Sequence, residues 1–442
     1  MIGPAPHIAT PHPGPRSTAI IERLRSSEGQ PGLTHGLSLE PVVLARAEGA
    51  VIEDLDGNRF LDMVAGFGSL NLGHSHPAIV DAAQRQLAEG QQAMSMASPV
   101  RTELIERLST RIPGLTRVML GASGSEATET ALKLARRATG KPGVLAFAGG
   151  FHGRTMGALG LMGREDQRTG LGPLGSVIHL PFPHALRSAF GSDPKTVAET
   201  TLDLIDIQLG DPAGGWDLIG AVVIEPVQGN GGMVPAPPGF LTGLREVCSR
   251  HNVLLVVDEV MSGFHRTGRP FALLHDDGVD PDLVILGKSL SAGLPLSGVL
   301  ARESVTSSTE PGTETSTYAG NLVSCAAALA ADEVYRAENL SAVAEALGGF
   351  LLWRLQDELG DDPRVAEVRG LGLMVGVELS GPDGSPLGVA KQVSEACVQR
   401  GLLVYPGGHY GNVVGMLPPL VATEEQLGTA VDILGAVLRS IR

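Results

Sequence analysis

The spacing of apolar residues changes twice along the chain. Residues 42–63 alternate apolar and polar positions around the turn-forming segment DLDGN, which predicts short antiparallel strands. From about residue 101, short runs of Val, Ile and Leu alternate with stretches of helical period. Such runs are typical of a mostly parallel sheet that helices cover on both faces. Beyond about residue 334, helical and strand-like segments indicate a smaller α+β domain.

The most regular helix is predicted over residues 125–140, with the sequence SEATETALKLARRATG. Its apolar face consists of Ala127, Ala131, Leu134, Ala135 and Ala138. We expect Gly140 and Pro142 to end it. The strand TRVMLG precedes this helix, and further strands are predicted in GVLAFAGG, LIGAVVIEP, NVLLVVDEV and PDLVILGKS.

The chain of 442 residues exceeds one ordinary core, so we expect more than one domain. The sequence shows no tandem repeat and no domain-length linker. The predicted organisation is a mobile N-terminal arm (1–35), the N-terminal part of a small domain (36–70), a large domain (71–333) and the C-terminal part of the small domain (334–442).

The bulk composition argues against several function classes. A formal net charge of −15 disfavours nucleic acid as a partner, because phosphates need a basic face. The longest apolar run, LVSCAAALAA at 322–331, is too short to cross a membrane and predicts a core helix. The N-terminal residues lack the basic and apolar regions of a signal peptide. The three cysteines (Cys248, Cys325 and Cys397) are far apart, which favours a reducing cytoplasm over a disulfide or metal framework.

Three predicted sheet strands end in an ionisable residue. VVIE ends at Glu225, LLVVD ends at Asp258, and VILGK ends at Lys288. In open parallel sheets, ligands bind outside the carboxyl ends of the strands. An Asp in such a place often only caps the next helix. The combination of three strand ends nevertheless predicts one shared site.

The segment GASGSEATETALK is a turn of small residues followed by a helix. Ser123, Gly124 and Ser125 are expected to offer backbone N–H groups and hydroxyls at the positive end of the helix dipole, which suits a phosphate. The alternative is a plain helix cap with a tight turn, since the segment is neither a Walker motif nor a dinucleotide fingerprint.

A phosphate site, a lysine and an acid at neighbouring strand ends together indicate pyridoxal 5′-phosphate (PLP). The lysine, Lys288, forms a Schiff base with the aldehyde. The acid, Asp258, pairs with the ring nitrogen and keeps it protonated. We expect Lys288 to be kept from solvent, because desolvation beside a cationic ring lowers the pKa of its amine.

With these residues the sequence resembles the class III (subgroup II) aminotransferases of PLP fold type I. The resemblance covers roughly residue 39 to the C-terminus. It is carried, in order, by the motifs GASGSEATETALKLAR, AFAGGFHGRTMGAL, VVIEPVQGNGG, LLVVDEVMSGFHRTG, PDLVILGKSLSAGLPLSGV, STYAGN and VRGLGLMVGVEL. It implies that residues 71–333 form the PLP-binding domain.

The resemblance also implies roles for single residues. Lys288 would be the Schiff-base lysine and the proton shuttle, and Asp258 the partner of the pyridinium nitrogen. Gly124 and Ser125 would hold the phosphate.

Around the ring, Phe151 would stack on one face with His152 beside it, and Val260 would pack on the other face. Met261 stands where many relatives have a glutamine near the ring oxygen. Thr317 resembles the threonine that reaches the phosphate of a neighbouring subunit, so the active unit would be a homodimer or tetramer. Without the family, Thr317 reads as a surface turn residue.

Three positions bear on the substrate. Arg154 in FHGRT corresponds to the arginine that grips a distal carboxylate in relatives. Gly415 stands where the family usually has an arginine for the α-carboxylate, so Glu225, which normally pairs with that arginine, is expected to face the pocket unpaired. The alternative is that Arg266, Arg269 or another arginine takes its place in space.

These features predict an aminotransferase that moves an amino group between glutamate and 2-oxoglutarate, or another amino and keto acid pair, and a non-α-amino-acid amine. A diamine or an amino sugar would suit the acidic pocket and the acidic chain.

The alternative is a racemase or epimerase, since VYPGGHYGNVVGMLPPL resembles amino-lactam racemases and isoleucine epimerases. Asn230, where those racemases carry an acid, and the retained Arg154 favour transamination, although His152 or His409 remains a candidate second base. A PLP fold used only for binding would be expected to lose Lys288 or Asp258, and both are present.

Overall fold

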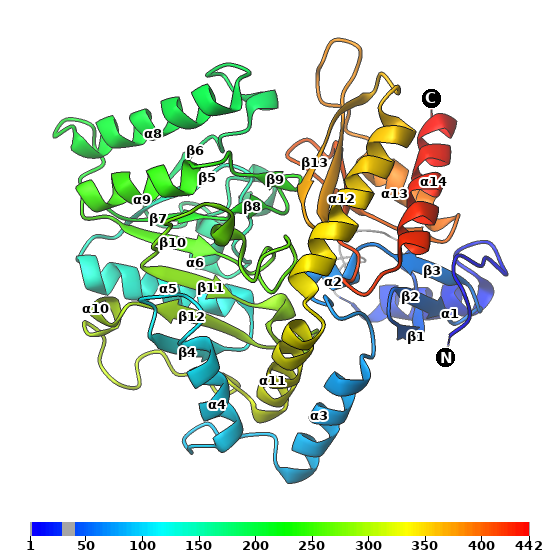
Figure 1. Ribbon diagram of the computed structural model, residues 1–442, viewed down its shortest axis with the longest axis horizontal. Coiled ribbons are helices and arrows are strands. Elements are labelled where there is room, and N and C mark those ends of the chain that lie inside the picture. Colours follow the sequence, from blue (N-terminus) through cyan, green and yellow to red (C-terminus); the bar gives the residue numbers. More distant parts are fainter. Residues whose placement is uncertain (1, 29–39, 442) are drawn as a thin grey trace. The chain divides into compact units, whose positions relative to one another are not determined.

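The computed structural model describes residues 2–28 and 40–441. They fall into two compact units, one made of Met1–Pro77 with Ala342–Arg442 and the other of Ala78–Ser341. Figure 1 labels the elements of each.

The unit Ala78–Ser341 is built on a seven-stranded sheet, counted over its described strands, with the order β4-β12-β11-β10-β7-β5-β6. Only β12 runs antiparallel to its neighbours β11 and β4, so the prediction of a mostly parallel sheet is confirmed. The strands are β4 (Arg117–Gly121), β5 (Gly143–Phe147), β6 (Val177–Leu180), β7 (Ile219–Ile224), β10 (Leu254–Asp258), β11 (Leu283–Leu286) and β12 (Ser297–Ala301). A short hairpin, β8 (Val227–Gln228) with β9 (Val234–Pro235), follows β7.

Helices cover both faces of this sheet, as predicted. On one face α5 packs its alanines and leucines against β10, β11 and β12, and on the other face α9 packs with α8. The α-helices of the unit are α3 (Pro77–Glu89), α4 (Pro99–Leu108), α5 (Gly124–Thr139), α6 (Met156–Gly160), α7 (Glu165–Arg168), α8 (Pro194–Gly210), α9 (Phe240–Arg250), α10 (Glu303–Thr306) and α11 (Leu322–Ala337). Three 3-10 turns complete it: η1 (Ala185–Arg187), η2 (Ala272–His275) and η3 (Lys288–Ser291).

Helix α5 follows the sequence prediction within one residue at each end. Ser123 caps it, accepting from the backbone N–H of Glu126 at 3.3 Å. Gly140 ends it in the left-handed conformation with φ 67°, which glycine adopts without a Cβ clash. The predicted phosphate residues Ser123, Gly124 and Ser125 are therefore the cap and the first two residues of this helix.

The other unit contains two small sheets among its described residues, β1-β2-β3-β15 and β13-β14-β17-β16. β1 pairs antiparallel with β2, and β2 pairs antiparallel with β3 across the turn DLDGN, as predicted. The strands are β1 (Leu44–Glu48), β2 (Val51–Asp54), β3 (Arg59–Asp62), β13 (Val365–Leu371), β14 (Met374–Leu379), β15 (Leu402–Leu403), β16 (Tyr405–Gly407) and β17 (Val413–Met416). The helices are α1 (Pro15–Ser27), α2 (Ala65–Gly68), α12 (Leu340–Leu359), α13 (Ala390–Val398) and α14 (Glu424–Ser440).

The N-terminal stretch, for which we predicted a mobile arm, contains structure that the sequence pattern did not reveal. His7 and Arg59 exchange backbone hydrogen bonds of 2.9 and 2.7 Å, and Asn58 accepts from the N–H groups of Ala9 and Thr10. Residues Pro15–Ser27 form helix α1. Residues 29–35 of the predicted arm lie outside the described residues.

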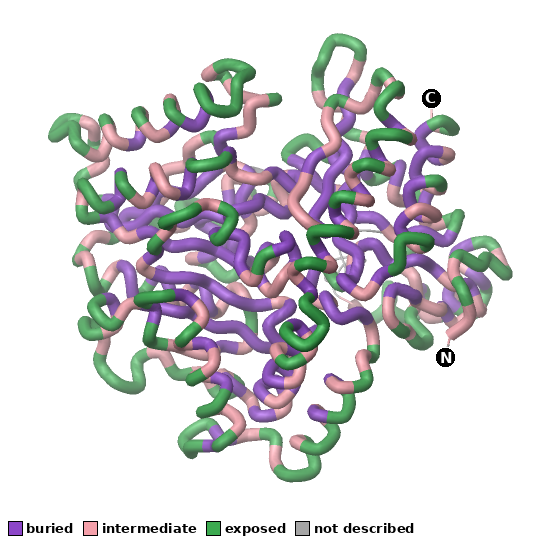
Figure 2. The backbone as a smooth tube through the Cα atoms, in the orientation of Figure 1, coloured by how far each residue is buried: buried purple, intermediate pink, exposed green. Residues whose placement is uncertain are grey.

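Burial follows the layers within each unit. Figure 2 shows the inner strands β5, β7, β10, β11 and β12 as buried, the edge strands β4 and β6 as mostly half-buried, and the outer sides of α8 and α9 as exposed. None of the described helices combines the length and the apolar character that a membrane crossing requires.

Candidate active site

The ionisable strand ends meet at one edge of the seven-stranded sheet. β7, β10 and β11 are adjacent and parallel, so they end on the same side. Glu225 follows β7, and Asp258 is the last residue of β10. Lys288 begins η3, and a single residue, Gly287, separates it from the end of β11. We call this place the carboxyl edge. The sequence pattern located it because parallel strands share one direction.

Lys288 occupies a strained and electrically unusual place. Its backbone φ is +43°, a left-handed conformation that non-glycine residues rarely adopt. Burial of the amine lowers its pKa to about 8, against the opposing charges of Glu225 and Asp258. The residue as a whole is half-buried, whereas its neighbours Ser289 and Leu290 are buried, so the expectation that Lys288 is kept from solvent is met only in part.

Asp258 is held by a histidine that lies far from it in the sequence. Nδ1 of His152 donates to Oδ2 of Asp258 at 2.7 Å, and both residues are buried, at 4% and 3% exposure. Burial alone would lower the pKa of His152, but the hydrogen bond and the charges of Asp258 and Glu225 raise it on balance. The other oxygen of Asp258 accepts from the backbone N–H of Val260 at 2.9 Å. The carboxylate is therefore fixed in orientation and faces a partner that can be cationic.

Glu225 is bound to the backbone. Its two oxygens accept from the N–H of Phe151 at 2.8 Å and of Gly229 at 3.1 Å. Both oxygens therefore have partners, but these are backbone groups and not the arginine that the resemblance implies. Burial raises the pKa of Glu225 to about 7, a rise that the charge of His152 limits. The carboxyl anchors the loop that carries Phe151.

The predicted phosphate turn closes against the other residues of the carboxyl edge. A Cβ placed on Gly124 or on Gly287 would lie 3.3 Å from Cγ1 of Val260, and that of Gly287 would lie 3.7 Å from Cα of Gly124. Oγ of Ser125 accepts from the backbone N–H of Arg154 at 3.0 Å. Glycine at these two points thus lets the turn, Val260 and the start of η3 approach one another.

Phe151, Arg154 and Met261 line the outer part of the same edge. The guanidinium carbon of the exposed Arg154 lies 5.7 Å from the ring centroid of Phe151. Met261 is partly exposed, and a Cβ on Gly229 would lie 2.1 Å from its sulfur. Arg154 therefore presents a cation next to the aromatic ring.

The remaining predicted residues lie differently. Thr317 is exposed, and its carbonyl accepts from Nε2 of Gln92 at 2.7 Å, away from the carboxyl edge. Of the two arginines considered as substitutes for the missing one, Arg266 is fully buried and its charge helps to lower the pKa of Lys288, whereas Arg269 is exposed.

Sequence reasoning missed two buried residues. Glu259 is fully buried, and its carboxylate accepts from the hydroxyl of Ser262 at 2.5 Å and from the N–H of Leu273 at 2.7 Å. The sequence did offer a signal for Glu259, because it is an ionisable residue within the apolar segment NVLLVVDEV, and a buried charge needs partners. Tyr335 donates to the carbonyl of Ser289 at 2.9 Å, and nothing in the sequence pattern pointed to it.

Comparison with known proteins gives this arrangement a family. The family model for class III aminotransferases matches residues 35–438. The chain is a class III aminotransferase. The family depends on PLP, so the enzyme uses this cofactor and the fold is that of PLP fold type I.

Three similar proteins illustrate the match. The 4-aminobutyrate aminotransferase of Mycobacterium tuberculosis is 35% identical over 98% of both chains. The diaminobutyrate–2-oxoglutarate aminotransferase of Rhizobium meliloti is 34% identical over 91% of this chain and 88% of its own. The crystal structure of a PLP-bound amine transaminase from an uncultivated Pseudomonas species has a TM-score of 0.85 and 32% identity over 94% of this chain and 98% of its own.

These comparisons support the aminotransferase prediction and give no support to the racemase alternative. Of the residues weighed for the racemase alternative, His152 binds Asp258 through Nδ1, and Oδ1 of Asn230 accepts from Arg164 at 3.2 Å.

The carboxyl edge of this class III aminotransferase fits PLP. It offers an amine with a lowered pKa, a fixed carboxylate, and a turn of small residues at the N-terminus of the 16-residue helix α5.

Proposed function

We propose that this enzyme moves an amino group between the glutamate/2-oxoglutarate pair and the terminal amine of an ω-amino acid or diamine. The observation that carries the proposal is the meeting of Lys288, Asp258 and the turn around Gly124 at the carboxyl edge.

Each residue has a task in this chemistry. Bound PLP supplies an aldehyde that captures amines and a ring that accepts electrons. Lys288 would form the Schiff base. Because burial lowers the pKa of its amine from 10.5 to about 8, about a tenth of the amine is neutral at pH 7 and able to accept a proton. Asp258, oriented by His152, would keep a proton on the ring nitrogen. Ser123, Gly124 and Ser125 bind the phosphate, while Phe151 and Val260 enclose the ring.

The substrate class follows from the charges and from the relatives. Arg154 offers an exposed guanidinium for a carboxylate distant from the reacting amine. The sequence has Gly415 where a second carboxylate grip is expected. Two relatives are named for 4-aminobutyrate and diaminobutyrate, which carry a chain-end amine and a carboxylate. An ω-amino acid or a diamine therefore fits better than an amino sugar.

The active unit in this proposal is a homodimer in the cytoplasm. Thr317 and Tyr318 are exposed, Tyr318 at 67%, and Met94 and Met96 expose 48% and 62% on the segment that binds the Thr317 loop through Gln92. Such side chains suit a contact with a second copy, whose site Thr317 would complete. The three cysteines are buried and free, which suits a reducing compartment.

The test is a half-reaction with L-glutamate alone. We expect the yellow PLP form of the enzyme to bleach, and 2-oxoglutarate to restore the colour. Absence of bleaching, with α-proton exchange and inversion of a chiral amine in deuterated water, would instead establish an epimerase.

Arg154→Lys tests the substrate assignment. Because lysine loses the two-pronged grip on a carboxylate, we expect KM for glutamate to rise by at least about tenfold. KM for putrescine, which has no carboxylate, is the internal control and should stay within about twofold. An equal rise for both amines would remove Arg154 from substrate binding.

A further inference from the structure

The turn that begins with Lys288 is held mainly by its own backbone. Leu290 donates to the carbonyl of Gly287 at 2.9 Å, and Ala292 donates to that of Ser289 at 3.3 Å. Both ends of the turn are left-handed, with φ +43° at Lys288 and +49° at Ala292. Non-glycine residues persist in this conformation only where their surroundings enforce it.

One side chain from outside the turn binds it. The hydroxyl of Tyr335, in α11, donates to the carbonyl of Ser289 at 2.9 Å, next to Lys288 in the chain. Tyr335 is buried, at 2% exposure. The carbonyl thus has a second donor besides the longer bond from Ala292, and this donor belongs to another element.

The same tyrosine touches the segment that follows Asp258. Its ring centroid lies 5.1 Å from that of His265 and 6.3 Å from that of Phe264. Both of these residues also have positive φ, at 70° and 54°. Tyr335 therefore contacts the segments that follow β10 and β11, two neighbouring strands of the carboxyl edge.

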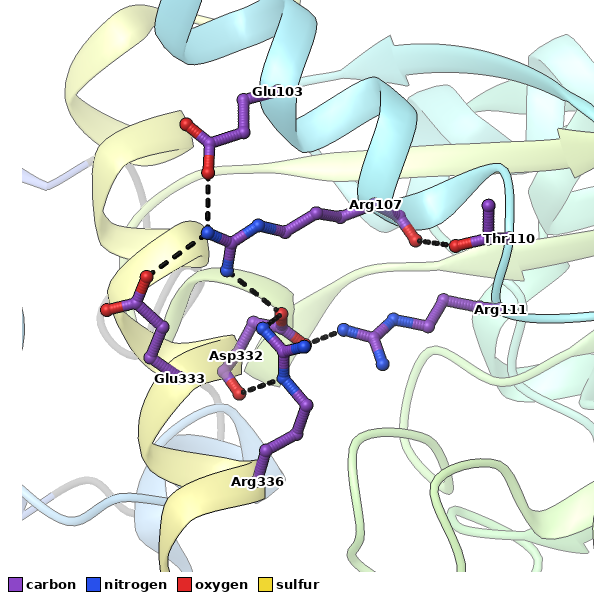
Figure 3. Close-up of polar contacts among 7 residues, drawn as sticks. All are labelled: Glu103, Arg107, Thr110, Arg111, Asp332, Glu333 and Arg336. Atoms are coloured by element: carbon purple, nitrogen blue, oxygen red, sulfur yellow. Dashed lines mark hydrogen bonds and ion pairs between the residues drawn. The ribbon is translucent and has the colours of Figure 1, made fainter.

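Helix α11 gives Tyr335 a fixed base. Asp332, one turn before Tyr335, accepts from Arg107 at 3.3 Å and also pairs with Arg111 and Arg336, and Arg107 binds Glu103 at 2.5 Å and Glu333 at 3.1 Å (Figure 3). These contacts join α11 to α4 and to the segment just beyond α4. The position of the tyrosine is thus set also by contacts that lie outside the turn that it binds.

We propose that Tyr335 is a positioning residue for Lys288: its hydroxyl fixes the carbonyl of Ser289 and so keeps the left-handed turn, and with it the lysine amine, in the conformation that bonds to PLP. The inference rests on the proposed role of Lys288 and adds a residue to it. Tyr335 acts through the backbone and does not touch the reacting atoms.

The variant Tyr335→Phe tests it in the apoenzyme, because phenylalanine keeps the ring contacts and removes only the donor. The first measurement is the rate at which added PLP becomes covalently bound, followed by absorbance. The second is the affinity for pyridoxine 5′-phosphate, which fills the same site and has no aldehyde for the lysine. The exposed Tyr410→Phe is the matched control for loss of a tyrosine hydroxyl.

We expect covalent capture in Tyr335→Phe to slow by about three- to tenfold, the range that the loss of one net hydrogen bond supports. Affinity for pyridoxine 5′-phosphate should stay within about twofold, since no contact to the phosphate turn changes. Unchanged capture, or an equal loss of capture and of pyridoxine phosphate affinity, would overturn the proposal.

Lys288→Ala separates this outcome from a failure of the proposed function. It should retain pyridoxine phosphate binding and lose all covalent capture. Covalent capture by Lys288→Ala would show that another lysine reacts, which would refute the role of Lys288 whatever Tyr335→Phe does.

Discussion

Asp258 and Glu259 are adjacent buried carboxylic acids with opposite surroundings. Asp258 faces His152, a group that can be cationic, whereas the partners of Glu259 are neutral: the hydroxyl of Ser262 and the backbone N–H groups of Leu273 and Ala272. Burial raises the pKa of Glu259 to about 7 from its ordinary value of 4.5. Asp258 thus has the place that we propose for the partner of the cofactor, whereas Glu259 holds the following loop onto η2.

The raised pKa of Glu259 makes stability depend on pH. A raised pKa in the folded state contributes stability that is complete below the unfolded pKa, near 4.5, and is lost as pH rises through about 7. Glu259→Gln removes this titration and keeps neutral hydrogen-bonding capacity. We expect the free energy of unfolding of the wild type to fall relative to Glu259→Gln by about 1–3 kcal/mol between about pH 5 and pH 8.

Urea denaturation at several pH values measures this difference. The exposed glutamate Glu246, replaced by Gln, is the control and should show no such pH-dependent difference. If Glu259→Gln and the wild type differ by the same amount at both ends of the range, Glu259 does not titrate there.

At the scale of elements, the sequence predicted best where local signals agreed. Helix α5 has a serine cap, an apolar face and a C-terminal glycine, and its bounds came out within one residue. The buried strands were found from their Val, Ile and Leu runs. Helix α1 was missed because its many polar residues and the prolines before it read as a loop, although Pro15 is well suited to a helix start. The helix that we expected to begin the small domain near Val334 is instead the end of α11, which runs from Leu322 to Ala337. Asp332 and Glu333 within α11 bind Arg107.

In the candidate site, too, the sequence predicted the features that have a local signal and missed those that depend on distant contacts. The sequence alone predicted that Glu225, Asp258 and Lys288 lie at one edge, because the ends of parallel strands meet on the same side of a sheet. The hydrogen bond of His152 to Asp258 joins residues 106 positions apart, and the backbone N–H groups that bind Glu225 carry no side-chain signal. Such contacts depend on loop conformation, which local pattern does not encode.

At the scale of the whole molecule, the account requires a second copy of the chain. We propose that residues 71–333 act as the PLP-binding domain and that Thr317 of one subunit completes the site of the other. Mixing inactive Lys288→Ala subunits with Thr317→Ala subunits tests this arrangement.

A mixed dimer has one intact site, because the Thr317→Ala subunit supplies Lys288 and the Lys288→Ala subunit supplies Thr317. We expect about a quarter of wild-type activity after statistical exchange of subunits, at a PLP concentration where Thr317→Ala alone is mostly empty. If Thr317 serves its own subunit, no mixed site is intact and mixing restores nothing.

The most direct measurement of the central claim is the identity of the lysine that bonds to PLP. The chain has five lysines, and reduction of the loaded enzyme with borohydride followed by peptide mass mapping distinguishes them: Lys133, Lys141, Lys195, Lys288 and Lys391. The account predicts the pyridoxyl group on Lys288, the lysine whose pKa burial lowers to about 8. A pyridoxyl group on any other lysine, or on none, would contradict it.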